Sequence, residues 1–214
     1  FYKKEYEKKS FYENKCYNRG CKYICGIDEV GRGPLAGPVV AAAVILKKDS
    51  YFEGLNDSKK LSEKKREELY DKIRNEAIAY AICEVNNEEI EKYNIYNAAR
   101  IAMQRAVEKL DVKPDFLLID AMPFENYPIP GYSMVKGDEK SVSIAAASVI
   151  AKVYRDNLMK KYASKYPYYD FENNAGYGTK KHLEGLRKHG ITPIHRRDFE
   201  PIKSMIKRGG NNGQ

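Results

Sequence analysis

The chain has 214 residues, 43% of them hydrophobic, which suits one large domain or a core with a small appendage. No apolar run reaches the about 20 residues that span a bilayer, and the irregular spacing of the four cysteines argues against a disulfide framework. The formal net charge of +8 favours an anionic partner, nucleic acid first.

The positive charge gathers toward the two ends of the chain. Residues 1–24 hold seven Lys or Arg against three Glu, and residues 176–208 hold nine Lys or Arg against three acids. Two interpretations stay open here. The basic flanks can bind nucleic acid, or they can be ordinary solvated lysine-rich surfaces.

Hydrophobic periodicity predicts alternating strands and helices after a basic, aromatic start. Residues 1–20 have no clear period and are interpreted as a short helix or an adaptable arm. The order of the elements predicts an α/β domain with a mixed sheet, followed by a basic helical piece. We expect strands over 21–28, 39–46, 78–85, 115–120 and 132–136, and helices from 58 or 62 to about 77 and over 94–110, 141–162, 180–188 and 201–207.

Three of the predicted strands end in acidic residues: Asp28 with Glu29, Asp120, and Asp138. The carboxyl ends of buried strands in an α/β sheet carry functional groups, because the loops converge there. Four carboxylates in one place would repel one another, and a divalent cation would relieve that cost. Ligands that are all oxygen suit Mg²⁺ or Mn²⁺ rather than zinc, and two such ions can hydrolyse a phosphodiester.

Each acid also has a plainer interpretation. Asp28 and Glu29 would face opposite sides of a regular strand, so a shared site requires Glu29 to lie where the strand ends. Asp120 can instead form a turn before Pro123, and Asp138 can cap the following helix. Taken together with the basic balance and the glycine loop, the acids favour a metal-dependent nuclease.

The loop after the first strand contains Gly31-Arg32-Gly33. Glycines let a backbone approach a ligand closely, and the arginine offers charge to a phosphate. The loop is not a P-loop, because no Gly-Lys-Ser/Thr follows, and no His-Glu-x-x-His pattern supports a zinc protease. Asp156, beside Arg155 on the long predicted helix, is interpreted as part of a surface ion pair.

Five blocks of sequence, in order, resemble bacterial ribonuclease HII. Residues 26–44 (GIDEVGRGPLAGPVVAAAV) resemble the opening signature of that family, and residues 57–62 (DSKKLS) are similar to its next block. The remaining blocks are Gly137-Asp138 with residues 143–156, residues 176–179 with His182, and residues 195–197 with Phe199 and Pro201.

The resemblance implies a ribonuclease H-like mixed sheet flanked by helices, with a helical C-terminal extension. It implies a catalytic core over 21–164 and a C-terminal helical substrate-binding subdomain over 165–208. Residues 1–20 form a basic N-terminal extension outside these blocks, and 209–214 a flexible tail. The related ribonuclease HIII group has an additional N-terminal domain and lacks the Gly-Arg-Gly loop in this form, which favours HII.

The resemblance also implies an activity and its site. The enzyme would cleave the RNA strand of RNA/DNA hybrids, and duplex DNA on the 5′ side of a single embedded ribonucleotide, leaving 5′-phosphate and 3′-hydroxyl ends. Its cofactor would be Mg²⁺ or Mn²⁺, with two ions acting together. By motif, the metal ligands and catalytic residues are Asp28, Glu29, Asp120 and Asp138, and the substrate-binding residues are Gly31, Arg32, Gly33, Lys59, Lys60 and Tyr177.

Within the substrate set, the Gly-Arg-Gly loop would hold the RNA–DNA junction, Lys59 and Lys60 would touch phosphates, and Tyr177 would pack on the junction nucleotide. One departure stands beside a ligand: the family usually has glycine where this chain has Ala121. Two alternatives remain, a non-catalytic nucleic-acid-binding module and another metal nuclease such as a DNA-junction resolvase. We expect a cytoplasmic monomer with no membrane partner, active in primer removal or ribonucleotide excision repair.

Overall fold

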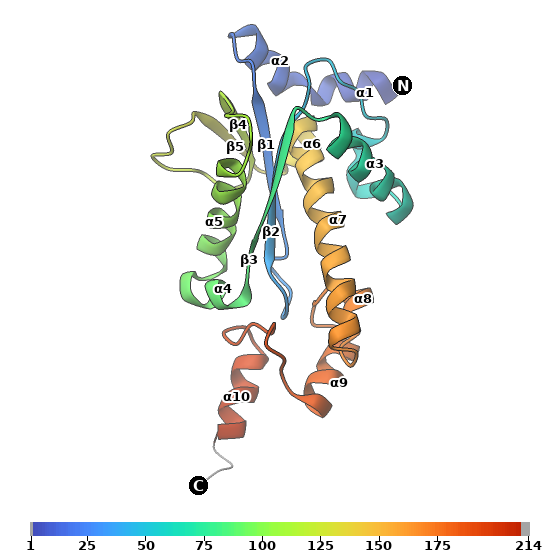
Figure 1. Cartoon of the computed structure of the whole chain (residues 1–214), viewed down its shortest axis with the longest axis vertical. Coiled ribbons are helices and arrows are strands. Elements are labelled where there is room, and N and C mark those ends of the chain that lie inside the picture. The colour runs from blue at the N-terminus through green and yellow to red at the C-terminus, as the bar shows by residue number, and fades with distance from the viewer. Residues whose placement is uncertain (1, 211–214) are drawn as a thin grey trace. The chain divides into compact units, whose positions relative to one another are not determined.

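A computed structural model describes residues 2–210, without the side chains of Tyr2 and of residues 56–58. Figure 1 shows the order of the elements along the chain. The strands are β1 (Ile24–Val30), β2 (Val39–Ile45), β3 (Ala79–Val85), β4 (Phe116–Asp120) and β5 (Gly131–Met134). The helices are α1 (Tyr2–Lys9), α2 (Phe11–Asn18), the 3₁₀ helix η1 (Leu55–Lys60), α3 (Glu63–Glu76), α4 (Asn87–Tyr93), α5 (Ile95–Glu108), α6 (Gly137–Lys140), α7 (Val142–Lys165), α8 (Phe171–Asn174), α9 (Lys180–His189) and α10 (Ile202–Gly210).

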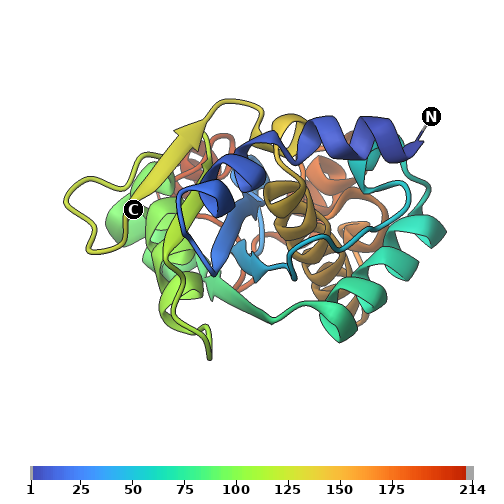
Figure 2. The same cartoon turned by 90° about the horizontal axis from the view of Figure 1, so that it is seen from above.

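Within the described residues, the strands form one five-stranded sheet in the order β3-β2-β1-β4-β5. β1 runs parallel to β4, and β4 runs parallel to β5. Figures 1 and 2 show α5 on one side of the sheet and α7 on the other. Strands covered on both faces are continuously apolar, which explains the runs of buried residues in β1 and β2. The predicted fold class, a mixed sheet flanked by helices, is confirmed.

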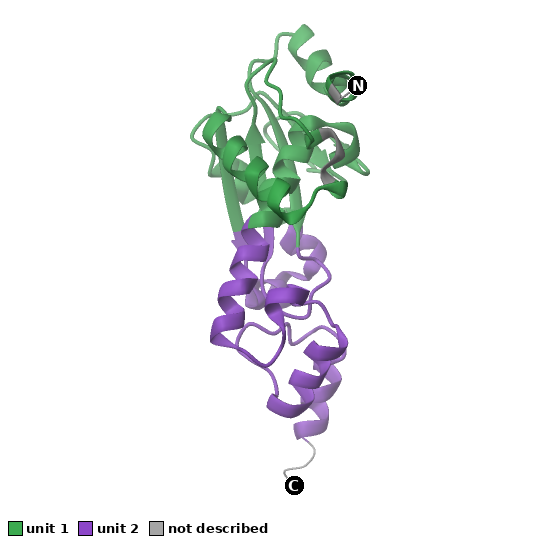
Figure 3. Cartoon of the chain, turned by 90° about the vertical axis from the view of Figure 1, so that its right-hand side faces the viewer, with its two compact units in different colours: residues 1–30, 41–83, 100–153 green, residues 31–40, 84–99, 154–214 purple. Residues whose placement is uncertain are grey.

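The chain divides into two compact units (Figure 3). Unit 1 comprises Phe1–Val30, Ala41–Cys83 and Arg100–Val153. Unit 2 comprises Gly31–Val40, Glu84–Ala99 and Tyr154–Gln214. The domain boundaries drawn from the sequence, at residues 20, 164 and 208, stay a prediction.

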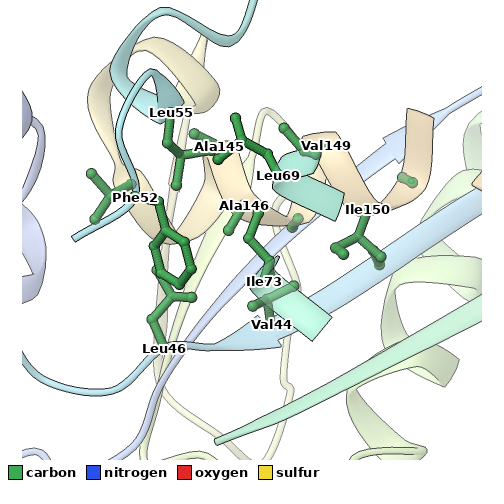
Figure 4. Close-up of a cluster of buried hydrophobic side chains, with 14 of the residues drawn as sticks. Val44, Leu46, Phe52, Leu55, Leu69, Ile73, Ala145, Ala146, Val149 and Ile150 are labelled. Carbon is green, nitrogen blue, oxygen red and sulfur yellow. The ribbon is translucent and has the colours of Figure 1, made fainter. Parts of the chain in front are cut away.

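One hydrophobic cluster of unit 1 joins β2, α3 and the first half of α7 (Figure 4). Val44 of β2 and Ile73 of α3 are fully buried in it. The small residues Ala145 and Ala146 let α7 pack closely here, as the apolar start of this helix in the sequence implies.

The predicted strands and long helices are confirmed to within a few residues at their ends. The short helices α4, α6 and α8 were not predicted. Within residues 2–18 the chain forms the two helices α1 and α2, separated by Ser10, rather than an arm. Of the predicted tail, Gly209 and Gly210 close α10, and 211–214 lie outside the described residues. No helix within residues 2–210 is both long and apolar enough to cross a bilayer.

Candidate active site

Three carboxylates of unit 1 meet at the ends of two neighbouring strands. Asp28 and Glu29 lie in β1, and Asp120 is the last residue of β4. One carboxylate oxygen from each residue lies within 4.8 Å of the other two. The cluster therefore offers several oxygen donors to a single position, which is the environment that a hard divalent cation prefers.

Parallel pairing of β1 with β4 explains why these acids meet. Ile27 pairs with Ile119, and each strand has an acid at its next position. Glu29 is the penultimate residue of β1, so it lies at the strand end, as a shared site requires. Its backbone N–H donates to Asp28 Oδ1 at 2.7 Å, which fixes the first carboxylate against the strand.

Asp138 belongs to the same neighbourhood but reaches it from α6. The first residue of that helix, Gly137, donates its backbone N–H to Asp120 Oδ1 at 2.7 Å. Lys136 precedes α6 and Ser141 precedes α7, so Asp138 is the N-cap of neither helix. The capping alternative for this acid is therefore wrong, and Asp138 remains a candidate ligand.

The electrostatics of the cluster are those of crowded acids. Burial raises the pKa of Asp28 well above its usual range, and the charges of Asp120 and Glu29 raise it further. Burial also raises the pKa of Asp120; the hydrogen bond from Gly137 opposes this effect, and the charge of Asp138 adds to it. A bound cation would offset both the burial of these acids and the repulsion between them, because it would pair with the ionised carboxylates.

The donor set fits Mg²⁺ or Mn²⁺. All the clustered ligands are carboxylate oxygens, with no histidine or cysteine among the group that the structure brings together in its described part. Soft or borderline metals prefer nitrogen and sulfur ligands, whereas Mg²⁺ and Mn²⁺ take oxygen. Asp28, Glu29 and Asp120 thus form the group that could hold an ion; Asp138 lies beside Glu29 at a neighbouring hollow and is not a member of that group.

A basic hollow of about 280 Å³ adjoins the acids in unit 1. Glu29 and Asp138 line it together with the cations Lys59, Arg66 and Lys152. Lys59 Nζ lies 2.9 Å from Glu139 Oε1 and 3.7 Å from Asp138 Oδ2. The sequence motif identified Lys59, but Arg66 and Lys152 were missed, since isolated basic residues on helices carry no signal of their own.

Lys60 is less well placed than Lys59. It is exposed at the end of η1 and is not among the described residues that line the hollow. Asp57 and Ser58, which belong to the same sequence block, have side chains outside the described residues.

Unit 2 contains the glycine loop, and two buried arginines bind its carbonyls. Arg155 is 1% exposed and Arg196 is fully buried, so Arg155 is not the surface residue that the sequence indicated. Burial lowers the pKa of Arg155 to about 10 and that of Arg196 to about 9. The acceptors are the carbonyls of Gly31, Arg32 and Gly37 for Arg196, and those of Ala36, Pro38 and Ala175 for Arg155.

Gly31 must be glycine for two reasons. Its φ is 93°, in the left-handed region that side chains disfavour, and an added Cβ would collide with the Arg155 side chain. Gly33 instead faces Tyr177, whose Cε1 would lie 3.1 Å from a Cβ at that position. The structure therefore brings two predicted substrate-binding residues together, with the half-exposed tyrosine ring over the glycine.

A buried histidine pair fixes the backbone of Tyr177. The Thr192 N–H donates to His195 Nδ1 at 2.9 Å, so the neutral ring has its proton on Nε2. His195 Nε2 then donates to His182 Nε2 at 2.9 Å, and His182 Nδ1 donates to the Tyr177 carbonyl at 2.9 Å. The sequence placed these histidines in the C-terminal blocks but gave no sign that they touch each other.

Comparison with known proteins identifies the family. The family model described as Ribonuclease HII matches residues 25–202. The chain belongs to the ribonuclease HII family. It is 59% identical over 207 residues to a Ribonuclease HII of Macrococcus caseolyticus, covering 97% of this chain and 76% of that protein. A Ribonuclease HII of Enterococcus faecalis is 57% identical over 201 residues, covering 94% and 78%.

The crystal structure of ribonuclease H2 from Pyrococcus horikoshii is similar in fold, with a TM-score of 0.76 and 26% identity. The match covers 87% of this chain and 98% of that one. The chain is thus a ribonuclease, and the alternative of a non-catalytic binding module is set aside. The family model begins after the N-terminal helices α1 and α2, so the family match gives no role to these two helices.

Proposed function

We propose that this ribonuclease is a metal-dependent endonuclease that recognises ribonucleotides paired with DNA. It cleaves the RNA strand of RNA/DNA hybrids and cuts duplex DNA on the 5′ side of a single ribonucleotide. The products carry 5′-phosphate and 3′-hydroxyl ends. The observation that carries this proposal is the meeting of Asp28, Glu29 and Asp120 in one cluster, in a chain of the ribonuclease HII family.

The acids hold the catalytic metal in this account. When bound, a pair of Mg²⁺ or Mn²⁺ ions activates water and stabilises the leaving oxygen of a phosphodiester. Asp28 and Asp120 are fixed by backbone N–H donors from Glu29 and Gly137, so their oxygens do not have to reorganise when the ion binds.

The basic hollow attracts the substrate backbone toward these acids. Lys59, Arg66 and Lys152 offset the negative charge that would otherwise repel a phosphate. Arg66 can donate two hydrogen bonds to one phosphate, whereas the two lysines act as point charges. These contacts hold the strand without reading its sequence.

Recognition of the ribonucleotide is proposed for Tyr177 and the loop Gly31-Arg32-Gly33. Tyr177 is half exposed beside Gly33, so part of its ring is available to a sugar or base. The 2′-hydroxyl is the group that distinguishes RNA from DNA at a given position. Arg196 fixes the loop backbone by binding the carbonyls of Gly31 and Arg32, and the missing side chain of Gly33 lets Tyr177 lie close to the loop.

We further propose that the enzyme acts as a monomer in the cytoplasm, in primer removal or in the repair of misincorporated ribonucleotides. None of its four cysteines, all of them described, forms a disulfide, which accords with a reducing compartment.

Product mapping on matched duplexes tests the proposal. The enzyme is incubated with Mg²⁺ or Mn²⁺ and three labelled duplexes: an RNA/DNA hybrid, DNA with one ribonucleotide, and DNA alone. We expect cuts in the first two, none in the third, and ligatable 5′-phosphate ends. Cleavage of the all-DNA duplex at a similar rate, or cleavage that persists with a chelator, would overturn it.

A further inference from the structure

Glu13 is a buried carboxylate that the proposed mechanism does not use. It lies in α2, outside the residues that the family model matches, and is 4% exposed. Its Oε1 accepts a hydrogen bond from Ser141 Oγ at 2.5 Å and one from the Ser143 N–H at 3.3 Å. A carboxylate buried this deeply is expensive, so its contacts require an explanation.

Those contacts hold the joint between α6 and α7. Ser141 is the single residue between the two helices, and its N–H donates to the Gly137 carbonyl at 2.8 Å. Its hydroxyl oxygen accepts from the Ile144 N–H at 3.2 Å, as an N-cap does. Glu13 therefore places a hydrogen-bond acceptor at the start of the 24-residue helix α7, whose first turn has no acid of its own.

The same joint positions the catalytic acids. Asp138 lies three residues before Ser141, in the four-residue helix α6, which is too short to be rigid alone. Gly137, at the start of that helix, donates to Asp120. Any shift of the joint thus moves one proposed ligand directly and removes the hydrogen bond that orients another.

The start of α7 also touches β1 without a side chain between them. A Cβ at Gly26 would overlap the backbone of Ser143, so strand and helix are in direct backbone contact two residues before Asp28. Figure 2 shows α1 and α2 passing beside α6 and the first turn of α7. Through Glu13, α2 thus contacts the region where α6, α7 and β1 meet.

We propose that Glu13 is a positioning residue for the metal site, and that this is the role of the N-terminal helix α2. Its hydrogen bonds to Ser141 and Ser143 fix the joint that sets Asp138 and Asp120 in register with Asp28. This inference rests on the proposed function, because it assumes that these acids bind the metal. Glu13 acts through geometry and touches neither substrate nor ion.

The test measures Mn²⁺ affinity, by electron paramagnetic resonance of free Mn²⁺, beside cleavage of duplex DNA that contains one ribonucleotide. The variants are Glu13→Ala, which removes the acceptor, and Glu13→Gln, which keeps an acceptor oxygen at the same place. Glu7→Ala is the matched control, because Glu7 is an exposed glutamate on α1. Asp28→Asn identifies the Mn²⁺ that binds the cluster. All titrations are made below the unfolding temperature of each variant.

We expect Glu13→Ala to weaken Mn²⁺ binding about tenfold, the scale of losing a partner behind a metal ligand. Glu13→Gln and Glu7→Ala should stay close to wild type, and at saturating Mn²⁺ the kcat of Glu13→Ala should recover while its KM for the duplex is unchanged. A merely structural role would lower the unfolding temperature and leave Mn²⁺ affinity intact. Should Glu13→Ala not fold, Ser141→Ala removes the same hydrogen bond from the other side.

Wild-type affinity in Glu13→Ala overturns the inference, and so does equal damage in Glu13→Gln, which would show that charge rather than the hydrogen bond matters. Failure of the proposed function looks different. In that case the wild-type protein would not cleave, or Asp28→Asn would bind Mn²⁺ as tightly as wild type.

Discussion

Ala121 stands directly after the proposed ligand Asp120 and has a left-handed backbone, with a φ of 54°. Its N–H donates to the Met134 carbonyl at 2.9 Å, so the turn is fixed in this conformation. A residue with a Cβ pays about 1–2 kcal/mol for such a backbone, whereas glycine does not. The departure from the family's usual glycine is therefore a local cost that leaves the carboxylate in place.

Replacing Ala121 by Gly should stabilise the enzyme. We expect a gain of about 1 kcal/mol in unfolding free energy, which raises the melting temperature by about 2–4 °C in a protein of this size. Thermal melts with a chelator present check it. Ala77→Gly, at the ordinary φ of −64° that ends α3, is the control and should not stabilise; a lower melting temperature for Ala121→Gly would contradict the account.

Tyr177 is the second residue whose replacement is informative. Stacking of a ring on a base contributes about 1–3 kcal/mol, so Tyr177→Ala should slow cleavage at a single ribonucleotide by about tenfold or more. Tyr80→Ala, an exposed tyrosine of β3, serves as the control. Unchanged discrimination between ribonucleotide-containing and all-DNA duplexes in Tyr177→Ala would remove this residue from recognition.

At the residue scale, the sequence predicted which acids lie at the strand ends, but it did not predict that Arg155 and Arg196 are buried. Acids that end apolar strands are visible because strand period and strand end are local properties. Arg155 and Arg196 were not recognised because arginine is rarely buried, and their acceptor carbonyls lie far away in the chain. Glu13 was missed for the same reason, since Ser141 is 128 residues away.

At the scale of elements, the pairing of α9 with the C-terminal segment depends on the neutral pair His182 and His195. Burial, followed by the charge of the neighbouring His182, lowers the pKa of His195 from 6.5 to about 3. Protonating either ring would place a proton between two nitrogens that already share one, or against the Thr192 N–H. The pair is therefore stable only while neutral.

Acid should weaken this pairing in a defined window. In the unfolded chain His195 is protonated below about pH 6.5, whereas in the folded protein it stays neutral down to about pH 3. The contribution of the histidine pair to the unfolding free energy is therefore fully present above pH 6.5 and decreases as the pH falls below it. One proton gives a slope of about 1.4 kcal/mol per pH unit. Denaturant unfolding from pH 7 to 5 should show the difference in unfolding free energy between wild type and His195→Gln shrinking; a difference that stays constant over this range would contradict the account.

Long elements were predictable and short ones were not. Continuous apolar runs and helical spacing determine β1, β2, α5 and α7 locally, so their ends were found to within a few residues. The four-residue helix α6 has no period to detect and exists because of its contacts to Asp120 and Ser141. The candidate site depends on such an element, which is why its acids could be identified from the sequence but their geometry could not.

At the scale of the whole molecule, the two units carry different parts of the proposed function. Unit 1 holds the acids, the basic hollow and the N-terminal helices, and unit 2 holds the glycine loop with Tyr177 and the histidine pair. Family membership accounts for the shared fold and the ribonuclease activity. The central claim is that the carboxylate cluster of unit 1 performs the cleavage.

The most direct test of that claim is cleavage of duplex DNA with a single ribonucleotide by Asp28→Asn, beside wild type and Asp111→Asn. Asp111 is exposed and precedes the amino end of β4, whereas Asp120 lies at its carboxyl end, so the Asp111 variant controls for loss of one acid. We predict that Asp28→Asn loses at least about a hundredfold in rate with Mg²⁺ or Mn²⁺, because a charge that acts in the transition state is removed. Its circular dichroism should match wild type, and Asp111→Asn should cut normally. Near-normal turnover by Asp28→Asn would contradict the account.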